Sequence, residues 1–334
     1  MANSPSSTLE KPIKRTARDY KSDVVSDWCP GCGDFGIVAA VQGVYAELGI
    51  ENHDVISYSG VGCSSKSPHL MQTYGVHTLH GRSIPFATGT AMCNTDVRVV
   101  VTGGDGDGYG IGAGHFLHAG RRNMNITYLV YNNAVYGLTK GQASPTLDLG
   151  EQPKSLPAPN PNNSVDPLAL AVSAGYTFVA RSYAYNRKHL METLKRAMNH
   201  NGMAIVDILQ PCPSYNNLHT KDWYGEDIEI SGNMFPRVYD IEAEGYNGKV
   251  SNPADAEEVN RKEIQALTKI REQDERVALG VFWEIDQPTF MDRIAPLNPK
   301  LAKTSSYKME IADEQGKPLV DLTDVYAEFR TDTY

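Results

Sequence analysis

Four of the five cysteines stand at spacings that could serve metal or redox chemistry. Cys29 and Cys32 form a C-x-x-C pair within SDWCPGCGDFGIV, Cys63 follows after a gap of 30 residues, and Cys212 after 148 more. The pair could be a redox disulfide, half of a zinc site, or two ligands of an iron–sulfur cluster. A zinc ribbon requires a second close pair, and a thioredoxin-type pair leaves Cys63 and Cys212 without a role. Four thiolates at one sheet edge would suit a [4Fe–4S] cluster, so the spacing alone makes the cluster a plausible hypothesis.

Two loops rich in glycine and polar residues could bind an anion. GGDGDGYGIG (residues 103–112) follows the apolar segment VRVVVT, and YNNAVYGLTKGQ (residues 131–142) follows the next apolar segment. Glycines let backbone N–H groups approach an anion, and a helix N-terminus adds a favourable dipole. Asp105 and Asp107 would repel a bare phosphate, so a hard cation such as Mg²⁺ would have to lie between them. Taken singly, the first loop is more simply a tight turn, and the second is more simply the end of a strand.

As a pair, the two loops resemble the thiamine diphosphate motif, in which G-D-G is followed some 25 residues later by N-N. Here Gly104-Asp105-Gly106 is followed by 25 residues and then by Asn132-Asn133. The resemblance implies that Asp105, Asn133 and the main-chain carbonyl of Val135 hold Mg²⁺ on the cofactor diphosphate. Asp107 would then either support these ligands or contact the diphosphate.

The elements that position these residues alternate between helix and strand. Apolar residues recur with helical period after Cys32, and Asp34 is the expected N-cap of that helix. Strands that are buried on both faces and separated by helices are typical of a parallel α/β sheet. We therefore predict an α/β fold with a doubly wound, mostly parallel sheet. Residues 1–22 are expected to be a polar tail, 23–220 the α/β domain, and 221–334 a loop-rich C-terminal arm packed on the domain or on a partner subunit.

Composition narrows the class of protein. The 334 residues carry a net charge of −9, which argues against a nucleic-acid-binding protein. No apolar run reaches the roughly 20 residues that span a membrane. The N-terminus lacks the apolar region of a secretory signal, so we expect a cytoplasmic protein without a membrane partner. Cys93, in a helix-like stretch, is expected to be a small buried apolar residue.

A longer set of segments resembles one enzyme family. WCPGCG, GVGCSSK, HGR, ATG, GGDGDGYGIGAGHFLHAGRRN, NNAVYGLTKGQASPT and QPCPSYN follow in order from about residue 23 to 220. Together they closely resemble the beta subunit of 2-oxoacid:ferredoxin oxidoreductases, most of all the 2-oxoglutarate branch (2-oxoglutarate synthase). The resemblance implies that Cys29, Cys32, Cys63 and Cys212 hold the [4Fe–4S] cluster and that Cys93 does not. It also implies that this chain carries the diphosphate half of a thiamine site completed by an alpha subunit, in a heterodimer or a dimer of heterodimers.

The implied reaction is the oxidative decarboxylation of 2-oxoglutarate with coenzyme A to succinyl-CoA, CO₂ and reduced ferredoxin, or its reverse. Pyruvate or a broad range of 2-oxoacids is the alternative substrate. Lys66 and Lys140 could face a substrate carboxylate or a coenzyme A phosphate, and His80 and Arg82 could contact the cofactor or the substrate's distal carboxylate. The residues expected around the cofactor are Gly62, Cys63, Gly104, Asp105, Gly106, Asp107, Leu138 and Thr139.

Two other classes of function explain fewer of these features. A non-redox thiamine-dependent decarboxylase would use both loops but would give the four cysteines nothing to do. A Cys₄ zinc scaffold protein would have no use for the two loops.

Overall fold

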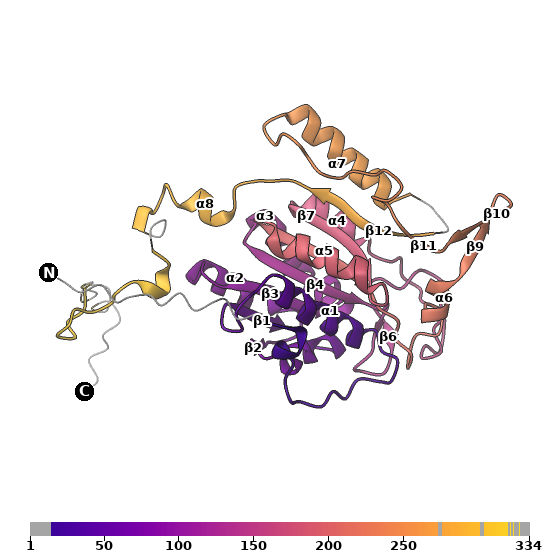
Figure 1. The fold of residues 1–334 in the computed structure, drawn as a ribbon, viewed down its shortest axis with the longest axis horizontal. Coiled ribbons are helices and arrows are strands. Elements are labelled where there is room, and N and C mark those ends of the chain that lie inside the picture. Colours follow the sequence, from indigo (N-terminus) through magenta and orange to yellow (C-terminus); the bar gives the residue numbers. More distant parts are fainter. Residues whose placement is uncertain are drawn as a thin grey trace.

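An eight-stranded sheet forms the centre of the molecule (Figure 1). The computed structural model describes residues 15–272, 276–300 and 304–319, together with residues 321, 323 and 327. The strand order is β11-β12-β7-β8-β4-β3-β1-β2. The bounds are β1 Val55–Ser59, β2 Tyr74–His77, β3 Arg98–Gly104, β4 Ile126–Asn132, β7 Phe178–Tyr183, β8 Met203–Leu209, β11 Val238–Asp240 and β12 Val277–Glu284.

The sheet is mostly parallel, which confirms the predicted fold class. The pairs from β2 through to β7 are all parallel, β12 lies antiparallel to β7, and β11 runs parallel to β12. Every residue of β4 and β8 is buried, as expected for central strands covered on both faces. The carboxyl ends of β1, β3, β4 and β8 therefore meet at one edge of the sheet.

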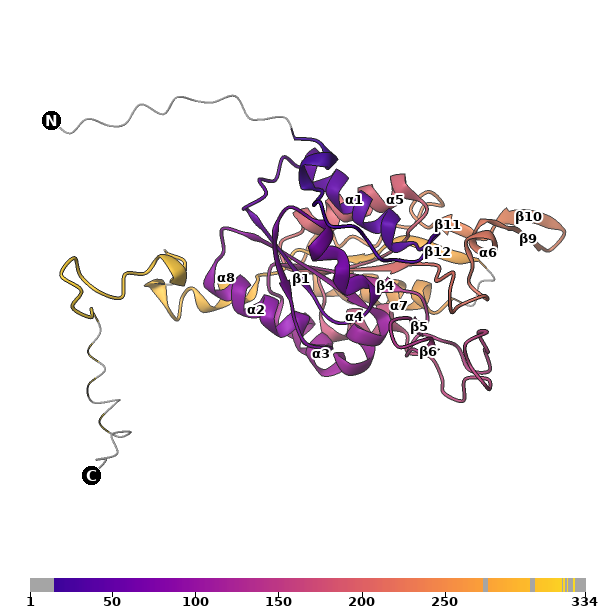
Figure 2. The same cartoon turned by 90° about the horizontal axis from the view of Figure 1, so that it is seen from below.

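Helices cover both faces of the sheet (Figure 2). One face carries α1 (Asp34–Glu47) and α5 (Arg187–Asn199), and the core beneath them includes residues such as Ile37 and Leu190. The opposite face carries the other four main helices, whose core includes Phe116. These helices are α2 (Ser83–Cys93), α3 (Ala113–Arg122), α4 (Pro167–Ala174) and α7 (Ala256–Ile270).

Two local predictions about helices are wrong. Asp34 is not the N-cap of α1, because Gly33 holds that position and Asp34 is the first helical residue. Cys93 is exposed rather than buried, because it is the last residue of α2, where the helix leaves the core. Gly49 follows the C-cap of α1 in the left-handed conformation at φ +62°, a usual end signal of a helix.

The folded domain begins before residue 23, the boundary expected from the sequence. Residues Ala17–Tyr20 form a short 3₁₀ helix, η1, and Tyr20 is fully buried. The Tyr20 hydroxyl donates hydrogen bonds to the carbonyls of Tyr45 and Ile50. The end of the predicted polar tail is therefore packed against α1.

The region after residue 220 is more than the loop-rich arm that we expected. It supplies β11 and β12 to the main sheet and α7 to one face, so much of it packs on the domain. A short helix α6 (Lys221–Gly225) leads into an antiparallel hairpin of β9 (Asp227–Ile230) and β10 (Asn233–Pro236), which projects from the body in Figure 1. Beyond β12 the chain runs through α8 (Phe290–Ile294) and the single turn η4 (Ser306–Lys308), away from the carboxyl edge.

Among the described residues, no helix combines the length and apolar character needed to cross a bilayer.

Candidate functional site

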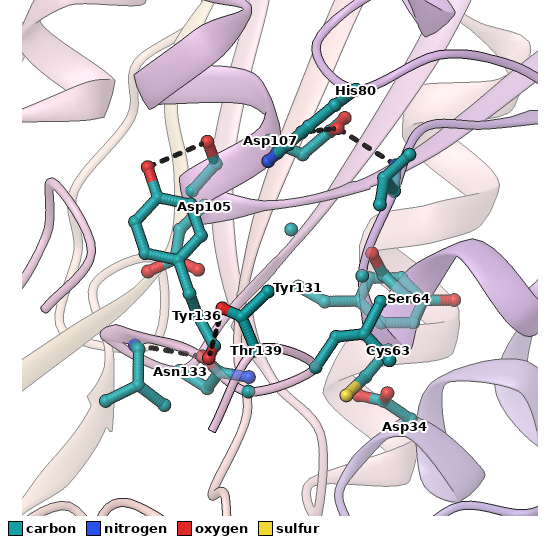
Figure 3. Close-up of a pocket in the computed structure, with 17 residues that line it drawn as sticks. Asp34, Cys63, Ser64, His80, Asp105, Asp107, Tyr131, Asn133, Tyr136 and Thr139 are labelled. Carbon is teal, nitrogen blue, oxygen red and sulfur yellow. Dashed lines mark hydrogen bonds and ion pairs between the residues drawn. The ribbon is translucent and has the colours of Figure 1, made fainter. Parts of the chain in front are cut away.

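A cavity opens at the carboxyl ends of β1, β3 and β4, where the sequence places the two glycine- and asparagine-containing loops (Figure 3). All eight expected cofactor residues line it, together with Asn133 and Val135 of the expected magnesium site: Gly62, Cys63, Gly104, Asp105, Gly106, Asp107, Leu138 and Thr139. In open α/β sheets this edge is where ligands bind. The structure therefore brings together residues that lie up to 77 positions apart in the chain.

Asp105 lies directly after β3 and is only 2% exposed. Its Oδ2 accepts hydrogen bonds from the Ala134 amide (3.0 Å), the Ser144 hydroxyl (2.5 Å) and the Thr146 hydroxyl (2.6 Å). Burial raises the pKa of the Asp105 carboxyl to about 6, and the hydroxyl contacts oppose that rise. A carboxylate held in this way is costly unless a cation accompanies it.

Asn133 sits beside Asp105 on a sharply turned segment. Ala134 has φ +63°, a conformation that non-glycine residues seldom adopt and that is often found at functional sites. Asn133 Oδ1 accepts from the Val135 amide (3.1 Å), and the Asn216 side chain donates to the Asn133 carbonyl (3.0 Å). The turn therefore places the Asn133 side-chain oxygen and the main-chain carbonyls of the same segment near the Asp105 carboxylate. These oxygens form a donor set suited to Mg²⁺.

The glycine loop forms a π-helix, η3 (Gly106–Ile111), rather than the open loop that was expected. π-helical turns inside longer helices are common at functional sites. A Cβ on Gly106 would lie 2.2 Å from the Tyr136 ring, so only glycine allows this approach. Tyr136 stands on β5 (Val135–Tyr136), which pairs with β6 (Gln142–Ala143), and its hydroxyl donates to the Gly106 carbonyl (3.3 Å). The segment 131–142, predicted as a loop, is thus a small hairpin.

Asp107 holds two loops and His80. Its Oδ1 accepts from the Val61 amide (3.0 Å), the Gly81 amide (2.8 Å) and His80 Nδ1 (2.6 Å). Its Oδ2 is buried without a hydrogen-bond partner among the described residues. Asp107 lines the cavity, and its contacts with His80 and the two loops fit the supporting role that was one of the two expected for it.

Two more buried polar groups face this cavity without full partners. Ser64 Oγ, 3% exposed, has no hydrogen-bond partner in the described part of the chain. Asp34 is 1% exposed, the Cys32 thiol lies beside it, and burial raises the pKa of its carboxyl to about 7. Such groups are rare in folded proteins unless a ligand satisfies them.

Of the four predicted cluster cysteines, Cys63 lines the cavity. Cys63 begins the 3₁₀ helix η2 (Cys63–Leu70) after β1, and Cys212 follows β8. Burial, together with the charges of Asp34, Cys212 and Cys29, raises the pKa of the Cys63 thiol to about 11. The charges of Cys212 and Cys63 likewise contribute to the raised pKa of the Cys32 thiol, so Cys63 lies within electrostatic range of the other three cysteines.

The sulfurs do not form a compact single-ion site. Over the residues that the structure describes, no group of three or more His, Cys, Asp or Glu side chains could hold one metal ion. A four-iron cluster spaces its thiolates more widely than a single ion does, and buried thiols with raised pKa values become thiolates only beside such positive charge. The Ser214 hydroxyl donates to Cys29 Sγ (3.0 Å). Four cysteine side chains are the set of ligands that a [4Fe–4S] cluster takes.

Of the four expected substrate residues, only His80 lines the cavity. The Lys66 ammonium pairs with Asp27 (2.8 Å). Lys140 is exposed at φ +90°, and Arg82 is exposed at the N-cap of α2. In this chain these three lie outside the cavity wall.

Sequence reasoning missed several residues of the site. Ser144 and Thr146 support Asp105, and Gln210 contacts Asn133 through the Asn133 side-chain amide (2.9 Å). The segments ASPT and QPC contain these residues, but only the fold reveals what they touch.

Two family profiles match the chain. Residues 60–208 match the profile described as "Thiamine pyrophosphate enzyme, C-terminal TPP binding domain". Residues 212–299 match the profile for the C-terminal region of the pyruvate ferredoxin oxidoreductase beta subunit. The first match contains both loops of the cavity, and the second begins at Cys212.

Curated relatives match almost the whole chain. The 2-oxoacid:ferredoxin oxidoreductase subunit beta of Sulfolobus sp is 48% identical over 296 residues, covering 87% of this chain and 92% of the relative. The protein of the same name from Saccharolobus solfataricus is 46% identical over 309 residues, covering 91% and 97%. The 2-oxoglutarate oxidoreductase subunit KorB of Mycobacterium tuberculosis is 37% identical, covering 85% and 82%.

A solved structure has the same fold. It is 2-oxoglutarate:ferredoxin oxidoreductase from Magnetococcus marinus with 2-oxoglutarate, coenzyme A and succinyl-CoA bound. It matches with a TM-score of 0.78 at 34% identity, covering 96% of this chain and 98% of that chain. Because these likenesses extend over nearly the full length of both partners, the chain belongs to the beta subunits of the 2-oxoacid:ferredoxin oxidoreductases.

Proposed function

We propose that this beta subunit, together with its alpha subunit, oxidises 2-oxoglutarate with coenzyme A to succinyl-CoA, CO₂ and reduced ferredoxin. The observation that carries the proposal is the double position of Cys63, which lines the cofactor cavity and also neighbours the other three cysteines. An electron path from a bound thiamine cofactor to a cluster would then be short. The same arrangement would serve the reverse carboxylation when reduced ferredoxin is abundant.

Asp105, Asn133 and Val135 are the proposed magnesium ligands. The three hydrogen bonds that Asp105 accepts from the 134–146 segment all go to Oδ2, so Oδ1 is the oxygen offered to the cation. Asn133 would contribute Oδ1 and Val135 its main-chain carbonyl. When bound, thiamine diphosphate supplies the stabilised carbanion that 2-oxoacid decarboxylation requires. The chain's own contribution is to fix the diphosphate and to keep the ligand oxygens in place.

Cys29, Cys32, Cys63 and Cys212 are the proposed ligands of a [4Fe–4S] cluster. Three of them are buried or half-buried, and Cys29 is exposed. An exposed ligand would bring one side of the cluster near the surface, where ferredoxin could accept electrons.

His80 is the proposed contact to the diphosphate. The cavity wall contains three carboxyl groups, on Asp34, Asp105 and Asp107, and His80 is the one basic side chain among its lining residues. The Asp107 contact to Nδ1 directs Nε2 away from Asp107 and makes it the ring nitrogen available to a ligand. Lys66, Lys140 and Arg82 lie outside this wall, so we propose that they meet substrate or coenzyme A only beside the alpha subunit.

The choice of 2-oxoglutarate is supported by the relatives named for it, which are 37% and 34% identical to this chain. Relatives at 46–48% identity carry the broader name 2-oxoacid:ferredoxin oxidoreductase. That difference favours a second candidate, an enzyme of the same chemistry that also accepts pyruvate.

The test is anaerobic purification of the chain with its alpha subunit, followed by iron and sulfide analysis. We expect about four irons per beta chain, as one Cys₄ cluster requires. A Cys212→Ser complex should lose them, and the matched control Cys93→Ser should keep them. Low-temperature EPR spectra after separate additions of 2-oxoglutarate and pyruvate then decide the substrate. Zinc in place of iron, or decarboxylation by a complex without any cluster, would contradict the proposal.

The mass of that complex tests its assembly. We propose a heterodimer or a dimer of heterodimers, which light scattering would distinguish. A beta chain that stays monomeric in the presence of its alpha subunit would refute this part of the proposal.

A further inference from the structure

The Gln210 side chain lies between the proposed magnesium site and the proposed cluster. It follows β8 and is 2% exposed. Its Oε1 accepts a hydrogen bond from Asn133 Nδ2 (2.9 Å). Its Nε2 donates to Cys32 Sγ (3.1 Å) and to the Pro211 carbonyl (2.8 Å). One amide therefore contacts a residue of each site.

The orientation of this amide is determined by its partners. A carbonyl oxygen can only accept a hydrogen bond, so the nitrogen of Gln210 must face Pro211. The Gln210 oxygen then faces Asn133, which must present its own amide nitrogen in return. As a result Asn133 Oδ1 points away from Gln210, where it accepts from the Val135 amide (3.1 Å). The contact with Gln210 therefore occupies the Asn133 side-chain nitrogen and leaves the Asn133 side-chain oxygen facing the proposed magnesium site.

The surrounding backbone leaves Gln210 little freedom. The main-chain N–H of Gln210 donates to the Asn132 carbonyl (2.7 Å), and this hydrogen bond ties Gln210 to the end of β4. A Cβ on Gly33 would lie 2.7 Å from Gln210 Cγ, so the glycine after Cys32 makes room for this side chain. The side chain is therefore held by contacts from three segments of the sheet edge.

We propose that Gln210 is a positioning residue for both sites: it orients the Asn133 amide toward Mg²⁺ and donates an N–H···S hydrogen bond that sets the reduction potential of the cluster. The second role rests on the cluster proposed above. Hydrogen bonds to the sulfurs stabilise the more negative, reduced state, so this bond raises the potential. The first role needs only the thiamine diphosphate site.

Two substitutions separate the roles. Gln210→Leu removes the side-chain hydrogen bonds to Asn133, Cys32 and Pro211 at similar volume, whereas Gln210→Glu keeps an acceptor for Asn133 and removes the amide donor to Cys32. Gln265→Leu, on the exposed face of α7, is the matched control. In the anaerobic complex with the alpha subunit, EPR-monitored redox titration gives the cluster potential. Calorimetry on the same complexes gives the affinity for Mg²⁺ with thiamine diphosphate.

Both Gln210 variants should shift the one-electron equilibrium about tenfold toward the oxidised cluster, which is about 59 mV. Only Gln210→Leu should weaken the affinity for Mg²⁺–thiamine diphosphate, by about 10- to 100-fold, as loss of a contact that orients a metal ligand does. The control should change neither quantity. A potential in Gln210→Glu equal to that of the control would overturn the role at the cluster, and an unchanged affinity in Gln210→Leu would overturn the role at Asn133.

The outcomes also separate this proposal from the proposed function. A wild-type complex without iron would refute the cluster, and with it the role at Cys32, while the affinity measurement would still decide the role at Asn133. If the Gln210→Leu complex does not assemble, Gln210→Met, which also lacks the amide and adds no charge, replaces Gln210→Leu in both measurements.

Discussion

Replacing Asp105 with asparagine should stabilise the metal-free chain at neutral pH while abolishing its binding of Mg²⁺. The carboxyl is fully buried after β3, and burial raises its pKa from 3.8 to about 6. An asparagine can keep the oxygen that accepts from Ala134, Ser144 and Thr146 but carries no charge to desolvate. The Asp105 carboxylate therefore destabilises the metal-free folded chain, and bound Mg²⁺ offsets that cost.

The size and pH range of the effect follow from that pKa. A rise of about two units corresponds to about 3 kcal/mol of unfolding free energy, an upper value at full ionisation. Because the folded pKa lies above the unfolded one, the folded chain binds the proton more tightly between about pH 4 and 6. Wild-type stability is therefore greatest below that range and falls as pH rises through it. The variant lacks this fall, so the two chains should diverge from about pH 4 and reach their full difference above pH 6.

Urea unfolding of the metal-free full-length chain at pH 4.5 and pH 7.5 measures the difference directly. The exposed residue Asp23, with no hydrogen bond or ion pair in the described structure, supplies the control Asp23→Asn. Addition of Mg²⁺ with thiamine diphosphate should raise the stability of wild type and of the control but not of Asp105→Asn. Equal stability of wild type and Asp105→Asn at pH 7.5 would refute the account of Asp105 as a desolvated carboxylate.

Three further perturbations test other parts of the structure. Thr146→Val removes one hydroxyl from Asp105 and should weaken Mg²⁺–thiamine diphosphate binding about 10-fold or more, measured by calorimetry. Asp207→Leu leaves the Arg181 guanidinium without its partner at 2.9 Å and should cost about 3 kcal/mol in urea unfolding. Burial lowers the pKa of His200, so its stabilising effect is complete above about pH 6.5 and is lost as the pH falls below that value. His200→Gln should therefore lose less stability than wild type between pH 7 and 5 in the same assay.

The central sheet could be predicted because its strands are buried on both faces and therefore consist mainly of consecutive apolar residues. β4 and β8 are the clearest examples, since none of their residues is exposed. The positions of Cys63 and Cys212 after strands followed from the same pattern, and the structure places both there. Parallel strands then bring residues distant in sequence to one edge without any further information.

The hydrogen bonds that hold the site residues in place could not be predicted, because they depend on which loops fold back to the carboxyl edge of the sheet. Ser144 and Thr146 reach Asp105 across 39 and 41 positions, through a hairpin too short to have its own periodic signal. The antiparallel pairing of β12 with β7 is likewise a choice of partner that no local pattern encodes. Asp107 shows a further limit: its contact with His80, 27 positions away in the chain, has no local sequence signal.

The charge of the cavity wall supports the proposal that an alpha subunit completes the site. Asp34, Asp105 and Asp107 face the cavity, and His80 is the one basic side chain among the residues that line it. A diphosphate adds more negative charge, so Mg²⁺ must neutralise most of it, and cofactor binding must depend steeply on the metal. The carboxylate of a 2-oxoacid would meet the same negative wall. We propose that the cations that receive it lie outside that wall, on residues such as Lys66 and Lys140 or on the alpha subunit, so that assembly of the two subunits would complete the substrate site.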